Sequence, residues 1–125
     1  MKLHATFDIA GWDESPIHEW EGGKLTRASV KKTFAGDIEG DAVLEYVMTY
    51  APDGTAAFVG LERLTGTAGG RKGALVLQQV GIFAGEAATA ALTVVGGSGD
   101  FEGASGSGKM VADPSGRVTL DVDLA

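Results

Sequence analysis

The sequence predicts an all-β fold, a single antiparallel β-barrel of about eight strands with essentially no helix. Apolar and polar residues alternate with a period of two in most segments, which is the pattern of half-buried strands. The 20 glycines recur between these segments without a collagen-like period, as expected of turns and bulges. No segment of helical length carries apolar residues at the i, i+3, i+4, i+7 spacing of an amphipathic helix. Residues 1–125 are therefore expected to form one β-barrel domain.

The first half of the chain contains three segments in which residues of one parity are mostly apolar. Leu3, Ala5 and Phe7 share one face of the first segment, and Val30 and Phe34 share one face of the second. These patterns predict strands over residues 2–12, 25–34 and 42–50, a polar loop over residues 13–23, and a turn over residues 36–41. A hairpin centred on Ile38 would place Lys31 opposite Glu45 and Val30 opposite Tyr46.

Residues 55–85 read as one long hairpin with a Gly-rich reversal between two apolar arms. Centred near Gly70, this hairpin would bring Glu62 opposite Gln78 on one face, with Arg63 and Gln79 on the other. A lumen-facing Glu62 would be desolvated and its pKa raised, which suits an acid, a base or a ligand anchor. A register shift of one residue would reverse the choice between the two polar pairs. The predicted arms are strands over residues 56–65 and 74–83, joined by residues 66–73.

The last part of the chain is interrupted most often by glycine and serine. A Gly-rich break follows the sixth strand at residues 96–100, residues 101–108 fit no class, and a turn is predicted over residues 113–116. Alternating apolar residues return at the C-terminus, where Val118, Leu120, Val122 and Leu124 share a face. The remaining predicted strands cover residues 86–95, 109–112 and 117–124.

These faces predict a lumen that binds a small apolar molecule, oriented by Glu62 and Gln78. Two alternatives stay open. In one, Glu62 is the general acid or base of a cofactor-independent cyclase or isomerase. In the other, Glu62 is paired only structurally, and the protein is a closed-barrel oligomer with no ligand. The apolar residues expected to line the lumen are Tyr46, Met48, Phe58, Leu64, Val76, Val80 and Ile82.

Composition argues against several other functions. A net charge of -7 argues against binding nucleic acid, which depends on clustered Lys and Arg. The absence of cysteine excludes disulfides and thiolate chemistry, and no metal or cofactor is expected, because His4 and His18 lack further ligands at fixed spacing. Residues 103–109 match half of a phosphate-loop motif, but Met110 replaces the required Ser or Thr. With no apolar run typical of a signal peptide or membrane span, a cytoplasmic protein is expected.

The central hairpin is apolar on both faces, because its outward positions also carry residues such as Val59 and Leu61. An apolar outer face favours coverage by a second subunit or by the N-terminal segment. We therefore expect a homo-oligomer.

Five runs of residues, spread over nearly the whole chain, form a distinctive set: residues 11–14 (GWDE), 22–28 (GGKLTRA), 58–63 (FVGLER), 77–79 (LQQ) and 94–99 (VVGGSG). Together they resemble the DUF3224 family, bacterial proteins of unknown function. The resemblance implies an allene oxide cyclase-like, calycin-like β-barrel, a type shared with cyclases that need no cofactor, although fold alone does not carry activity. The family pattern often has His at the position of Gln79, so an imidazole-dependent reaction is not expected here.

Overall fold

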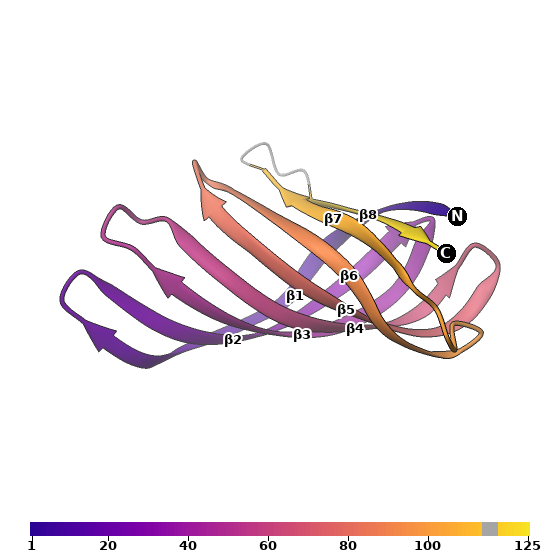
Figure 1. Ribbon diagram of the computed structural model, residues 1–125, viewed down its shortest axis with the longest axis horizontal. Coiled ribbons are helices and arrows are strands. Elements are labelled where there is room, and N and C mark those ends of the chain that lie inside the picture. The colour runs from indigo at the N-terminus through magenta and orange to yellow at the C-terminus, as the bar shows by residue number, and fades with distance from the viewer. Residues whose placement is uncertain (114–117) are drawn as a thin grey trace.

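The computed structural model describes residues 1–113 and 118–125, in which eight antiparallel strands form a closed ring (Figure 1). Each strand is hydrogen-bonded to its neighbours in sequence, and β1 closes onto β8. These described residues contain no helix, and hence none that could cross a membrane. The all-β, eight-stranded prediction is confirmed. The strands are β1 (Lys2–Trp20), β2 (Gly23–Gly36), β3 (Ile38–Tyr50), β4 (Ala56–Ala68), β5 (Arg71–Ala84), β6 (Ala87–Gly99), β7 (Gly106–Ala112) and β8 (Val118–Leu124).

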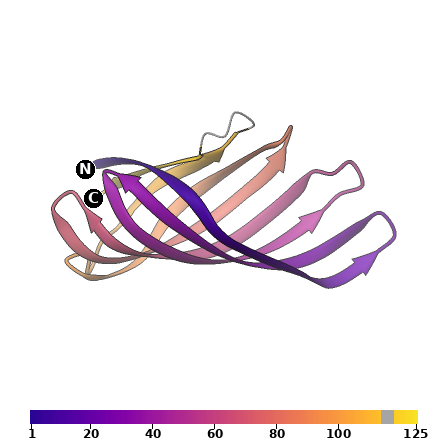
Figure 2. The same ribbon diagram turned by 180° about the vertical axis from the view of Figure 1, so that it is seen from behind.

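β1 is much longer than predicted, because the expected loop over residues 13–23 continues the strand to Trp20. Its ladder with β2 runs to the pair Trp20 and Gly23, with irregularities between Ile9 and Gly11 and between Pro16 and His18. Pairing with β8 in the described part of the chain covers only Lys2–Thr6. The rest of β1 forms a long arm with β2 (Figure 2). Proline is tolerated in such an edge strand, where its missing N–H costs no ladder bond.

The β2–β3 hairpin has the predicted faces but not the predicted register. Val30 pairs with Leu44 and Lys31 with Val43, two residues away from the expected partners Tyr46 and Glu45. An offset of two leaves every side chain on its predicted face, because strand side chains alternate with a period of two.

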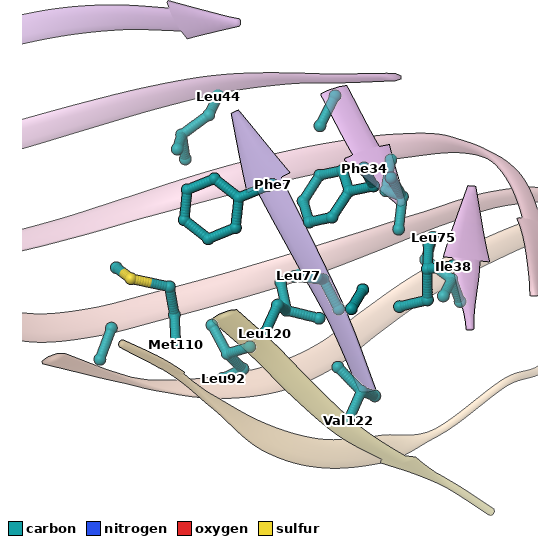
Figure 3. Packing of buried hydrophobic residues seen from close by; sticks show 14 of the residues in the cluster. Phe7, Phe34, Ile38, Leu44, Leu75, Leu77, Leu92, Met110, Leu120 and Val122 are labelled. Atoms are coloured by element: carbon teal, nitrogen blue, oxygen red, sulfur yellow. The ribbon is translucent and has the colours of Figure 1, made fainter. Parts of the chain in front are cut away.

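One end of the ring is closed. The buried Phe101, from the stretch that the sequence did not classify, lies there beside Ile38, Leu64 and Leu75, around a void of only about 10 Å³. Aromatic and aliphatic side chains fill the ring's middle, where the rings of Phe7 and Phe34 have centroids 5.5 Å apart (Figure 3).

β7 begins at Gly106, three residues before the predicted strand. Residues 114–116 of the predicted turn lie outside the described residues, and so does Arg117, the predicted start of the last strand.

The outer face of β3, β4 and β5 carries apolar side chains, as the sequence indicated. Val47, Val59 and Val80 follow one another across the three strands and are each at least 42% exposed. That a second copy covers this face remains a prediction.

β3 and β4 approach closely where Gly40 pairs with Gly66, and a Cβ atom at Gly66 would overlap the carbonyl oxygen of Glu39. We expect Gly66→Ala to lower the free energy of unfolding by about 1–3 kcal/mol, because the strands must separate to admit the methyl group. Urea denaturation measures the effect. Gly96→Ala is the matched control: its Cβ would meet Val76 at an ordinary 3.5 Å. Equal stability of the two variants would contradict the steric explanation.

Candidate functional site

Four polar side chains, one from each of four adjacent strands, form a connected cluster inside the ring. Tyr46 on β3 donates a hydrogen bond to Gln79 Oε1 on β5 (2.6 Å), and Gln79 Nε2 donates to Glu62 Oε1 on β4 (2.5 Å). Lys32 on β2 completes the series, with its Nζ 3.6 Å from Glu62 Oε2. We call Lys32, Tyr46, Glu62 and Gln79 the polar cluster.

A glycine makes room for this connection. Gly60 lies between Tyr46 and Gln79 in the ladder, paired with both. A Cβ atom at Gly60 would come within 2.6 Å of the Tyr46 ring. The phenol can therefore cross β4 to reach Gln79 only because position 60 lacks a side chain.

Burial dominates the electrostatics of the cluster. Glu62 is 0% and Lys32 is 3% exposed. Burial raises the pKa of Glu62 and lowers that of Lys32, and in each case the opposite charge of the partner works against the shift. Burial also raises the pKa of Tyr46, as does the nearby Glu62 carboxylate. The surroundings thus disfavour the charged form of every titratable group in the cluster.

Lys32 and Glu62 have unused hydrogen-bonding capacity. Neither Lys32 Nζ nor Glu62 Oε2 has a hydrogen-bond partner among the described residues. The Lys32 ammonium instead lies 4.1 Å from the centroid of the Phe7 ring, in cation–π contact. Buried polar groups in proteins are nearly always hydrogen-bonded, so these two atoms are exceptions to the usual pattern.

A cavity of about 240 Å³ opens beside the cluster, at the end of the ring opposite Phe101. Its walls are mostly apolar, and Phe7, Met48, Phe58 and Met110 contribute to them. Lys32, Tyr46 and Tyr50 are its polar lining residues. Lys32 thus contacts both the cavity and Glu62.

The β1 arm contributes to the mouth of this cavity through Trp12. Next to it, Glu14 accepts hydrogen bonds from Tyr50 (2.5 Å), Thr26 (2.7 Å) and Trp12 (3.0 Å). Partial burial by itself would raise the pKa of Glu14, but these hydrogen bonds lower it below its ordinary value. Burial and the contact with Glu14 raise the pKa of Tyr50 to about 12. A carboxylate therefore holds three strands together at the mouth.

The predicted lining residues divide into two groups. Glu62, Tyr46, Met48, Phe58 and Leu64 are buried inside the ring, although Leu64 lies at the closed end. The predicted placement of the other four residues in the lumen was wrong. Gln78, Val80 and Ile82 are exposed on the outer face, and Val76 is half-buried at a hollow on that face.

The turn explains this error. Gly69 and Gly70 both have positive φ (58° and 80°), as the two central residues of a type I′ turn require. The hairpin is therefore centred between them, not on Gly70, and Glu62 pairs with Leu77 while Leu61 pairs with Gln78. Gln79 consequently shares the interior with Glu62.

Lys32 was missed by the sequence reasoning. Lys32 is an even number of residues from Val30 and Phe34, so it lies on the apolar face of its strand. A lysine at such a position was the signal that could have identified it. Trp12 and Glu14 were missed because they fell in or beside the predicted loop. Among the described residues, no group of three His, Asp or Glu side chains is arranged to hold a metal ion.

Breaking the buried pair should cost more than removing it. We expect Lys32→Met and Glu62→Gln each to lower the free energy of unfolding by about 3 kcal/mol, because each leaves a buried group without its partner. The double variant should recover part of the loss, since the amide introduced at position 62 would still accept a hydrogen bond from Gln79. Urea denaturation at neutral pH gives the coupling energy. Strictly additive losses would show that the two side chains do not interact.

Glu14 should make stability depend on pH at the acid end. Its folded-state pKa is lower than the ordinary 4.5, so its contribution is full above that value and is lost as pH falls through the folded-state pKa. We expect Glu14→Gln to destabilise by about 1 kcal/mol at pH 7, a hydrogen-bond value reduced for solvent exposure. The difference from wild type should vanish at strongly acidic pH in urea unfolding. Glu21→Gln, at an exposed position after β1, is the control; a pH-independent difference for Glu14→Gln would refute the assignment.

Comparisons with known proteins agree with this architecture. A family model described as "Protein of unknown function (DUF3224)" matches residues 3–124. A crystal structure of a DUF3224-family protein of unknown function from Shewanella oneidensis MR-1 is similar at a TM-score of 0.80 and 26% identity, covering 100% of this chain and 96% of that one. A search of curated proteins gave no match. With the model match spanning nearly its whole length, the chain belongs to the DUF3224 family.

Proposed function

We propose that the protein binds a small, largely apolar and uncharged molecule in the 240 Å³ cavity, with Lys32 donating a hydrogen bond to an oxygen of the ligand. The observation that carries this proposal is that Lys32 Nζ, on a side chain that lines the cavity, has no hydrogen-bond partner among the described residues. A buried ammonium without a hydrogen bond costs free energy that an acceptor on a ligand would regain.

Charge balance favours an uncharged ligand. The Lys32 ammonium is already matched by Glu62 at 3.6 Å, and Glu14 places a second carboxylate beside the mouth. An anionic ligand would add a buried negative charge next to these groups, and a cationic ligand would meet Lys32. A neutral carbonyl compound offers an acceptor without either penalty.

The cavity volume favours a small ligand, because pockets for drug-sized molecules usually measure about 300–1,000 Å³. Tyr46, Met48 and Phe58 belong to the lining, as the sequence suggested. Acid or base catalysis by Glu62 acting directly on the ligand is less well supported, since Glu62 is fully buried and Lys32 is the member of the pair that lines the cavity.

Three molecules with the same six-membered ring test the proposal: cyclohexanone, cyclohexanecarboxylate and cyclohexylamine. In calorimetric titrations at neutral pH we expect cyclohexanone to bind most tightly. Replacing Lys32 by Met should weaken that binding about tenfold, the equivalent of one hydrogen bond of about 1.4 kcal/mol.

Lys31→Met is the matched control, because Lys31 is the neighbouring residue and is exposed. The double variant Lys32→Met/Glu62→Gln repeats the measurement without an unpaired buried carboxylate. Tighter binding of the carboxylate or the amine, or unchanged ketone binding without Lys32, would contradict the proposal.

A further inference from the structure

We propose that Lys32 is a nucleophilic amine that forms an imine with small apolar aldehydes and ketones entering the cavity. This inference rests on the proposed binding function and adds a covalent reaction to it. Three features of the site support it: the surroundings of Lys32, its pairing with Glu62, and the fixed orientation of that carboxyl group.

The first feature is desolvation. A lysine amine attacks a carbonyl carbon only in its neutral form, and an apolar site favours that form. The Lys32 side chain is 2% exposed and contacts the Phe7 ring, and its pKa is lowered by burial. Lys31, the neighbour in sequence, is exposed and has no such environment.

The second feature is a proton acceptor that makes the neutral amine accessible. Glu62 Oε2 lies 3.6 Å from Nζ, and burial raises the pKa of its carboxyl group. A proton moved from Lys32 to Glu62 converts an ion pair into a neutral amine and a neutral acid. This transfer leaves no net charge in the interior, so the site need not bury an uncompensated ion.

The third feature holds the carboxyl group in place. Gln79 donates to Glu62 Oε1, and Gln79 is itself oriented because Tyr46 donates to its Oε1. Glu62 Oε2 is then the oxygen turned to Lys32, and it has no other hydrogen-bond partner among the described residues. Tyr46 and Gln79 are thus positioning residues, and Lys32 is the group that meets the ligand.

The reaction balances without an oxidant or a reductant. Neutral Nζ adds to the carbonyl carbon, and the carbonyl oxygen takes a proton from the attacking nitrogen to give a carbinolamine. Glu62 then gives its proton to the nitrogen, which passes a proton on to the hydroxyl group. Water then leaves as the C=N bond forms. The products are a protonated imine at Lys32, a carboxylate at Glu62 and one water molecule, so the charge pair is preserved.

Reductive trapping tests the proposal on the whole protein. Cyclohexanone is added with sodium cyanoborohydride, which reduces an imine to a stable secondary amine, and peptide mass spectrometry locates the modified lysines. We expect Lys32 to be labelled at least tenfold faster than Lys31 and with saturation at high cyclohexanone concentration. Labelling of Lys32 no faster than of exposed lysines would overturn the proposal.

Two substitutions separate the proton-transfer role of Glu62 from a structural one. At saturating cyclohexanone, Glu62→Gln should slow the labelling of Lys32 at least tenfold, and Glu62→Asp, which keeps a carboxyl group, should restore part of the rate. Labelling of Lys32 in Glu62→Gln as fast as in wild type, or no recovery of the rate in Glu62→Asp, would refute this role.

The calorimetric titration distinguishes the two proposals. Cyclohexanone binding without selective labelling of Lys32 would refute imine formation and leave the binding function standing. No binding in wild type would refute both.

Discussion

The structure depends on one constraint: in a sheet closed into a ring, every second residue of each strand must fit the same interior. Lys32, Glu62 and Gln79 have interior parity on three different strands. None of them can turn to water without moving its whole strand, because a shift of one residue reverses both faces. The closed sheet accommodates these inward polar residues by letting them contact one another. The cavity lies beside them at the open end of the ring, where Lys32 is part of its lining.

Which side chains of a strand share a face could be predicted from the sequence. Which residues of two neighbouring strands lie opposite each other could not. The faces of β2 and β3 follow from local periodicity alone. β4 is apolar on both faces, so periodicity left the choice between an inward Glu62 and an inward Arg63 to the hairpin register. Whether Gln78 or Gln79 joins Glu62 depends on the centre of the turn. Four glycines between residues 66 and 73 left that centre ambiguous in the sequence, and the positive φ values of Gly69 and Gly70 decide it.

Other features escaped prediction because their causes are not local. Pro16 and its polar neighbours indicate a loop by composition, but fourteen residues of β2 offer a partner, and β1 continues along them. Glu14 acquires its role only through this ladder. The cavity likewise is lined by side chains from several strands, such as Phe7, Met48 and Met110. These residues are far apart in the sequence, so no local pattern could show that they lie close together.

The long arm of β1 has a consequence for how this protein behaves in a concentrated solution. Over the described residues, β1 beyond Thr6 is bonded to β2 alone, so one row of its backbone groups faces away from the sheet. Such an edge is a template on which another chain can add a strand. Here Pro16 removes a donor, two irregularities bend the strand, and Asp13 and Glu19 add charge. The features that made this segment look unlike a strand are of the kind that oppose the addition of another chain at an open edge.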